Sequence, residues 1–126
     1  NPDLGHYIAA GNTDVFEFLS KMNKKIYSMH VKDRTTPANG QDYTPFGMGD
    51  TPIVDVLQLM RDQKYSFPAT IEYEYKTPKN STIINEIKKC VDLHKDRQTL
   101  CFTVAIFFIT KNNTLFQKNS NETRRI

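Results

Sequence analysis

The sequence predicts an α/β fold in which short parallel strands alternate with amphipathic helices. Strand-like runs and helical runs of apolar residues follow one another along residues 12–95. This alternation is typical of a parallel sheet with right-handed crossovers. Polar and charged residues also stand on one face of two predicted strands, which indicates that this face lines a site.

Residues 12–31 contain the first helix and a strand. Asn12 or Thr13 can cap the helix, and the strand-like run IYSMHV follows over residues 26–31. The apolar residues that recur at helical spacing are Val15, Phe16, Leu19 and Met22. A polar loop rich in Thr, Pro and Gly separates this strand from the next helix.

Residues 51–95 repeat the pattern with a helix, a strand and a second helix. Thr51 is a candidate cap and Pro52 suits the first helical position. The strand is the run ATIEYEY over residues 69–75, and the last helix covers 80–95. The residues expected to face inward are Ile53, Val56, Leu57 and Met60 in the first of these helices, and Ile83, Ile84, Ile87 and Val91 in the second.

The faces of the two strands are unusual for a parallel sheet covered by helices. His30 shares its face with Ser28, while Glu72 shares its face with Thr70 and Glu74. A buried carboxylate costs several kcal/mol unless it is paired or binds a cation. A barrel interior explains these faces better, because inward residues near the carboxyl ends of barrel strands line an active site.

Asp3, His30 and Glu72 each fall near the carboxyl end of one of three successive strands. If these ends meet, the two carboxylates and the imidazole can bind a divalent ion such as Mn²⁺, Mg²⁺ or Zn²⁺. Taken singly, each residue also has an ordinary alternative as a capping acid, a hydrogen-bonded histidine or an edge-strand glutamate. The three together favour a metal site.

Length and charge restrict the remaining classes. The 126 residues form one domain at most, and two cysteines in no metal-like spacing favour a reducing, cytoplasmic location. Residues 1–94 carry eleven basic and twelve acidic side chains, so they do not resemble a nucleic-acid-binding surface. The apolar run over 100–109 is shorter than the roughly 20 residues that span a bilayer, so no membrane partner is expected.

Four ordered motifs resemble the later half of the sugar phosphate isomerase/epimerase family, the xylose-isomerase-like barrels. They are PDLGHY with the nearby AAG, then HVKD, PFGMGD and TIEYEY. The resemblance implies that residues 1–96 are the last three β/α units of a (β/α)8 TIM barrel. Residues 97–126 do not follow the family, and we expect them to form an atypical tail that is either an extra strand or disordered.

The resemblance also implies a ligand set. The family holds its ion (Mn²⁺, Mg²⁺, Co²⁺ or Zn²⁺) with a Glu, an Asp, a His and a second Glu, and Asp3, His30 and Glu72 match the last three. The first Glu is expected on a strand before Asn1, so we expect this chain by itself to be incomplete or inactive, with weak metal binding and little catalytic turnover. Glu74 is the alternative to Glu72. His6 is either a substrate contact or a residue of a helix start or turn.

The chemistry that the resemblance implies is isomerisation or epimerisation of a sugar or sugar phosphate through an enediolate, with Glu72 moving the proton. Lys32 and Asp33 could orient a sugar hydroxyl or a phosphate, or they could form a salt-bridged loop start. Gly47 and Gly49 precede a helix and could present N–H groups to a phosphate, although a tight turn is the simpler interpretation.

Two other functions fit parts of the sequence. Apurinic endonucleases share the D-x-x-H motif and the later His, but they need an Asp-Arg-His triplet in a loop that reads TTPANGQDYTPFG here, without histidine. A non-catalytic barrel remnant could instead bind another chain, or a second copy of itself as a homo-oligomer, through exposed strand edges.

Overall fold

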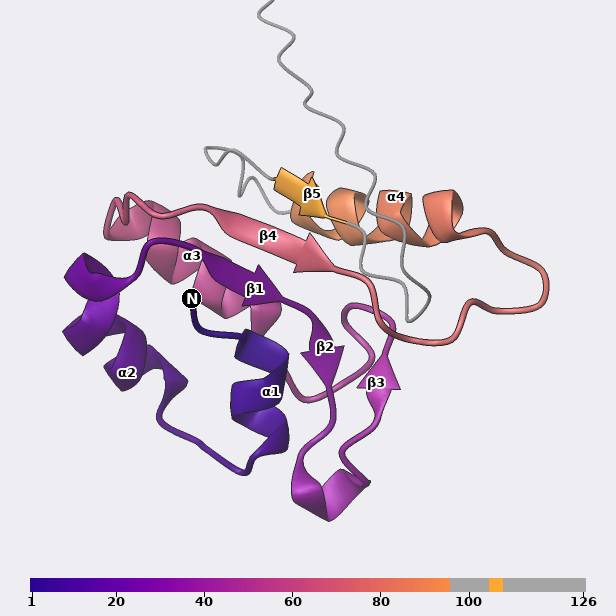
Figure 1. Cartoon of the computed structure of the whole chain (residues 1–126), viewed down its shortest axis with the longest axis horizontal. Coiled ribbons are helices and arrows are strands. Elements are labelled where there is room, and N and C mark those ends of the chain that lie inside the picture. Colours follow the sequence, from indigo (N-terminus) through magenta and orange to yellow (C-terminus); the bar gives the residue numbers. More distant parts are fainter. Residues whose placement is uncertain (96–104, 108–126) are drawn as a thin grey trace, which may run out of the picture.

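The computed structural model describes residues 1–95 and 105–107, and its central feature is a parallel sheet (Figure 1). The sheet has the order β1, β4, β5, with β1 at Met29–Val31, β4 at Ala69–Glu72 and β5 at Ala105–Phe107. Both β1 and β5 run parallel to β4, which confirms a mixed α/β fold with parallel strands. The described residues form no closed barrel.

Both predicted strands are shorter than the sequence indicated. The strand predicted over 26–31 begins only at Met29, because a short 3-10 helix (η1, Asn23–Lys25) precedes it. The strand predicted over 69–75 ends at Glu72. Tyr73 and Tyr75 leave the sheet and pack against the last helix, which explains this early end.

The described part of the chain has four α-helices beside the sheet: α1 (Leu4–Ala9), α2 (Val15–Met22), α3 (Ile53–Asp62) and α4 (Ile83–Lys95). Helix α1 was not predicted. The segment between β1 and α3 also contains a small antiparallel pair, β2 (Asp33–Arg34) and β3 (Tyr43–Thr44), joined through a 3-10 turn (η2, Pro37–Asn39). This pair occupies part of the region predicted as a polar loop.

The core lies between β1, β4 and the helices α1 to α3 (Figure 1). Met29 and Val31 of β1 are completely buried in it, and the predicted inward stripe of α3 is confirmed. The core residues that these elements share are Leu4, Ile8, Val15, Leu19, Met29, Val31, Ile53, Val56, Leu57, Met60 and Ala69. His30 therefore points away from the core, from the opposite face of its strand.

Several details of the predicted helices are wrong. Asp14, rather than Asn12 or Thr13, immediately precedes α2, and no side chain caps that helix. Phe16 is 41% exposed and Ile84 is 63% exposed, so neither faces the core. Phe16 follows the buried Val15, which helical geometry places about 100° away. Ile84 follows Ile83, which is itself only partly buried.

Thr51 is not a helix cap, because its hydroxyl accepts the backbone N–H of Arg34 at 3.0 Å. The last position before α3 is Pro52, which makes no side-chain capping bond. No helix among the described residues is long and apolar enough to cross a membrane.

Candidate metal centre

Asp3 is positioned by the start of α1. One oxygen of its carboxylate, Oδ1, accepts the backbone N–H of His6 at 2.9 Å, which makes Asp3 the N-cap of the helix. The backbone at Asp3 forms a parallel bridge with His30 of β1, in which the N–H of His30 donates to the carbonyl of Pro2 at 2.9 Å. The D-x-x-H motif thus forms a helix cap that also holds Asp3 beside His30.

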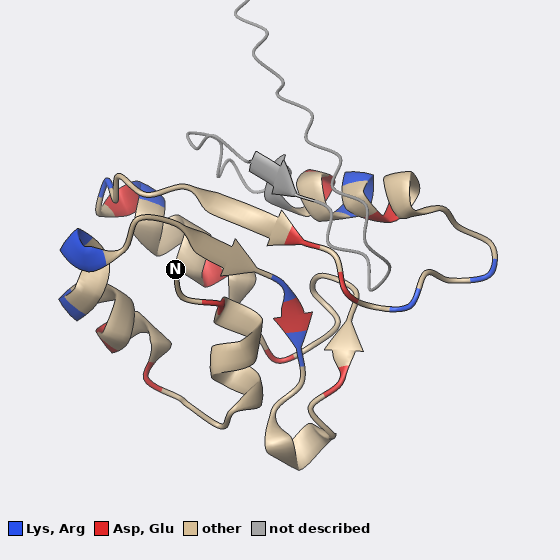
Figure 2. Cartoon of the chain, viewed as in Figure 1, with Lys and Arg blue, Asp and Glu red and all other residues tan. Residues whose placement is uncertain are grey.

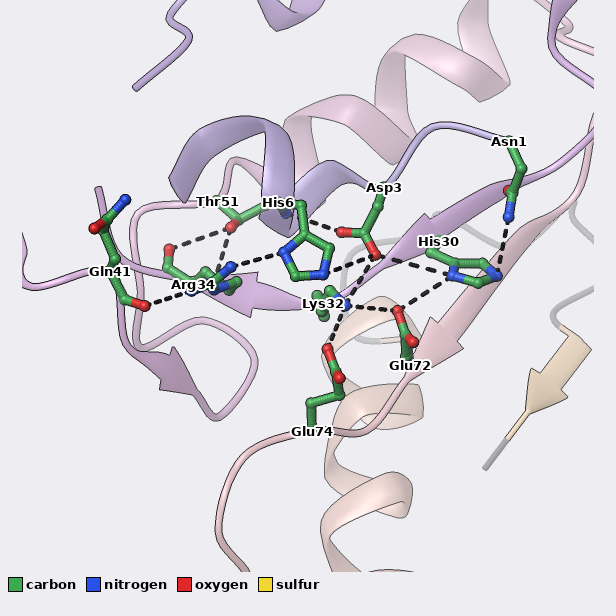
Figure 3. A network of polar contacts seen from close by, with 10 residues as sticks. All are labelled: Asn1, Asp3, His6, His30, Lys32, Arg34, Gln41, Thr51, Glu72 and Glu74. Atoms are coloured by element: carbon green, nitrogen blue, oxygen red, sulfur yellow. Dashed lines mark hydrogen bonds and ion pairs between the residues drawn. The ribbon is translucent and has the colours of Figure 1, made fainter. Parts of the chain in front are cut away.

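His30 and Glu72 come to the same place through the register of the sheet. His30 of β1 lies opposite Thr70 of β4, so Glu72, two residues further on, projects from the same face as Thr70. The Nδ1 atom of His30 lies 3.2 Å from Oε2 of Glu72 and 3.9 Å from Oδ2 of Asp3 (Figure 3). All three side chains therefore meet on one face of the sheet, toward the carboxyl ends of its parallel strands.

Asp3, His30 and Glu72 fit a divalent ion. Each offers one ligand atom, and these atoms all lie within 4.8 Å of one another. An imidazole nitrogen with two carboxylate oxygens is a donor set that suits Zn²⁺, Mn²⁺ and related ions. This geometry confirms the predicted convergence of the three residues and identifies them as a candidate metal-binding triad.

Lys32 is the central cation of this cluster in the structure. Its Nζ lies 2.9 Å from Oδ2 of Asp3 and 2.8 Å from Oε2 of Glu72, and it also contacts Oε2 of Glu74. The side chain is only 3% exposed. Burial by itself would lower the pKa of the ammonium group, but the hydrogen bonds to Glu72, Glu74 and Asp3 outweigh it and raise that pKa.

The carboxyl group of Asp3 is kept ionised by its surroundings. Its partial burial would raise the pKa, but the backbone N–H of His6 and the ammonium of Lys32 both donate to it, and the net effect is a lowered pKa. With three carboxylates facing a single ammonium group, the cluster has an excess of negative charge. Such an excess favours the binding of a further cation.

His6 and Arg34 form the more exposed side of the centre. The side chain of His6 is 49% exposed, with Nε2 at 3.9 Å from Oδ2 of Asp3 and Nδ1 at 2.7 Å from Nη1 of Arg34. The guanidinium group of Arg34 lies over the ring of Tyr43 at 4.2 Å, and its Nη2 donates to the carbonyl of Gln41 at 2.6 Å. His6 is thus both a helix-start residue and a side chain that a ligand could reach.

Arg34 was not predicted to be part of this site. Its position follows from strand alternation, because His30, Lys32 and Arg34 are spaced two residues apart along an extended segment. Extending the predicted strand through HVKDR by this rule would have found it. Figure 3 shows all three side chains in one polar network with Asp3 and His6.

Asp33 lies on the opposite face of that segment and is only 1% exposed. Its carboxylate accepts the backbone N–H groups of Gly47 at 2.7 Å, Gly49 at 3.0 Å and Thr51 at 3.2 Å. The N–H groups of the two glycines, which were predicted as possible donors to a phosphate, therefore donate to the carboxylate of Asp33. The substrate contact predicted for Asp33 stays a prediction.

Gly47 and Gly49 form a turn around this carboxylate. Gly47 has a φ of 82°, a conformation that favours glycine. A Cβ atom added at Gly49 would lie 2.3 Å from Oδ1 of Asp33, so no larger residue fits there without displacement. The tight turn is the interpretation that the geometry supports.

The chain was compared with known protein families and with individual proteins. A family model described as the xylose isomerase-like TIM barrel matches residues 1–93. No curated protein and no solved structure matches the chain. Since the family match covers 93 of the 126 residues, the chain belongs to the xylose isomerase-like TIM barrel family.

Proposed function

We propose that this chain carries the metal site of a divalent-metal-dependent sugar or sugar-phosphate isomerase or epimerase. The observation that supports this most strongly is the meeting of Asp3, His30 and Glu72, with ligand atoms within 4.8 Å. Membership of a family described as xylose isomerase-like supports the same conclusion. Within that family, we propose that residues 1–96 correspond to the last three β/α units of the barrel.

The triad residues have two proposed roles, which are to hold the ion and to transfer a proton. An ion held by Asp3, His30 and Glu72 would polarise adjacent oxygens of a bound sugar and acidify the C–H bond between them. We propose that Glu72 accepts that proton and returns it to a neighbouring carbon, which requires a carboxylate fixed in position. Binding to the ion would fix Glu72 in the loaded protein, and Lys32, whose Nζ donates to Oε2 at 2.8 Å, holds Glu72 while no ion is bound. Glu74 is the alternative to Glu72 as a ligand.

The substrate is proposed to approach from the side of His6, which is the half-exposed member of the cluster. Its imidazole could donate to, or accept from, a sugar hydroxyl next to the ion. Lys32 remains a proposed contact for the same substrate. The contact predicted for Asp33 stays a prediction, because this residue is 1% exposed and its side chain lies on the opposite face of the segment. A small sugar suits this site better than a nucleic acid, because residues 1–94 carry one more acidic than basic side chain.

Proton abstraction offers the most direct test of this proposal. The purified chain, loaded with Mn²⁺ or Zn²⁺ in heavy water, would be incubated with a panel of aldoses, ketoses and their phosphates. Exchange of a carbon-bound proton for deuterium, followed by nuclear magnetic resonance, detects the abstraction step even where overall turnover is slow. We expect exchange with at least one sugar, and we expect Glu72→Gln to abolish it.

The matched control is Glu17→Gln, because Glu17 is an exposed glutamate of α2 that pairs with Lys21 on the same helix. This variant should exchange at the rate of the parent chain. If Glu72→Gln exchanges as fast as its parent while remaining folded and metal-bound, Glu72 has no acid–base role. A folded chain that binds no divalent ion would instead support a non-catalytic remnant that binds another chain or a second copy.

A further inference from the structure

The ammonium group of Lys32 lies against oxygens that belong to the candidate metal-binding triad. Nζ is 2.9 Å from Oδ2 of Asp3 and 2.8 Å from Oε2 of Glu72, which are ordinary distances for charge-assisted hydrogen bonds. Figure 3 shows this ammonium group between the carboxylates of Asp3, Glu72 and Glu74. In the structure, Lys32 thus supplies a positive charge close to where the proposed site would hold its ion.

Lys32 cannot easily withdraw into water. The side chain is 3% exposed, and the glycine at position 5 lies directly against its aliphatic part, because an added Cβ there would lie 2.5 Å from Cγ of Lys32. A carboxylate-bound Zn²⁺ sits about 2.0 to 2.2 Å from its oxygen. An ion on Oε2 of Glu72 would therefore lie within about 5 Å of Nζ as it now stands.

Glu74 gives the ammonium group an alternative partner outside the triad. Its Oε2 contacts Nζ, and its side chain is more exposed than that of Glu72, at 19% against 8%. Lys32 can therefore keep one carboxylate partner while it releases the other two. Glu74 thus has a role in the cluster that does not require it to bind the ion.

We propose that Lys32 is an internal competitor of the metal ion. Without metal, its ammonium group holds Asp3 and Glu72 together. When an ion binds, the ammonium group must leave the oxygens of Asp3 and Glu72 and keep only its contact with Glu74. This inference rests on the proposed metal site. A competitor role and a purely structural role for Lys32 predict opposite effects of this residue on metal affinity. A competitor lowers metal affinity, whereas a residue that only positions the ligands raises it.

Lys32→Met separates these two roles, because methionine keeps an unbranched side chain and removes the charge. Metal affinity would be measured by calorimetric titration of the metal-free chain with Mn²⁺ and with Zn²⁺. We expect the variant to bind at least about tenfold more tightly than the parent chain, a difference of about 1.4 kcal/mol. Lys21→Met removes a charge of the same sign from an exposed lysine of α2 and should leave the affinity unchanged within about twofold.

The melting temperature of the same variants gives a readout independent of activity. Without metal, Lys32→Met should melt at a lower temperature than the parent, because three carboxylates then face one another without a cation. Added metal should raise its melting temperature by more than that of the parent, since tighter binding to the native state stabilises it more. If Lys32→Met binds metal as weakly as the parent chain or more weakly, the competitor role is wrong, but the proposed metal site is not contradicted.

Glu74→Gln tests the proposal in a chain that keeps Lys32, in case Lys32→Met does not fold. With its alternative acceptor weakened, Lys32 should hold Asp3 and Glu72 more firmly, and metal affinity should fall at least about threefold, whereas Glu17→Gln should not change it. An affinity for Glu74→Gln equal to that of the parent would contradict the competitor role. If the parent chain and every folded variant bind no metal, the proposed metal site itself is wrong.

Discussion

Gly5→Ala probes the contact that holds α1, and with it Asp3, against the strand segment that carries Lys32. Gly5 lies in the first turn of α1, where its backbone is helical and a side chain is not excluded by φ. An added Cβ would, however, lie 2.5 Å from Cγ of Lys32 and 2.9 Å from the carbonyl oxygen of the same residue. Ordinary contacts of a Cβ atom begin near 3.4 Å.

Two opposing effects decide the result of this substitution. Alanine is intrinsically better than glycine inside a helix by about 1 kcal/mol. Overpacking of a close contact typically costs about 1 to 3 kcal/mol. The second effect should dominate, because one of the two contacts is a backbone oxygen that cannot rotate away. We expect the free energy of unfolding to fall, by up to about 2 kcal/mol.

Urea unfolding, followed by circular dichroism, measures this change as a shift of the midpoint at constant slope. Metal titration of the same variant should also show weaker binding, since α1 can relieve the clash only by moving Asp3 with it. The variant Ala9→Gly, at the other end of α1, is the control. It changes helix propensity without a new clash and should leave metal affinity unaffected. A Gly5→Ala chain that is more stable than its parent and binds metal equally well would refute the reasoning.

Three other substitutions test separate parts of the structure. Asp33→Ala should lower the free energy of unfolding in urea by about 2 to 4 kcal/mol, because it leaves the three backbone N–H groups of the Gly47 to Thr51 turn without their acceptor; an unchanged midpoint would show that water replaces the carboxylate. Met60→Ala should cost about 2 to 5 kcal/mol because Met60 is fully buried, whereas Met48→Ala, at a residue that is 74% exposed, should change it by less than about 0.5 kcal/mol. Glu86 has its pKa lowered to about 2, first by the hydrogen bond from Lys89 and then by those from Ser81 and Tyr75. Its contribution to stability should be complete above pH 4.5 and lost as the pH falls toward 2, so Glu86→Gln should flatten that part of a plot of unfolding free energy against pH.

The helices α2 to α4 and the faces of the strands were predictable because they depend on local spacing. The buried stripe of α3 follows from residues three and four apart, and the opposite orientations of Met29 and His30 follow from alternation in a strand. The strand ends were not predictable by the same rule. Tyr73 and Tyr75 continue the alternating pattern of β4, but they pack against α4, which begins several residues later in the chain.

The candidate site also has residues that the sequence could predict and placements that it could not. Asp3, His30 and Glu72 could be chosen from the sequence, because polar residues at equivalent places on parallel strands meet at one end of a sheet. The sequence predicts Lys32 and Asp33 together as substrate contacts, because they are neighbours directly after His30 and Val31. The structure places their side chains on opposite faces, with Lys32 among the triad carboxylates and Asp33 inside the glycine turn.

The sequence by itself therefore determined which residue types stand at the ends of the strands and which face of each strand they share. Only the tertiary structure decided how their charges are paired. Strand pairing makes Lys32 a neighbour of Glu72 and Glu74, at sequence separations of 40 and 42 residues, and the N-cap of α1 brings Asp3 to the same ammonium group. Pairing of charges depends on distances of a few ångströms across the sheet, and local sequence patterns do not contain those distances.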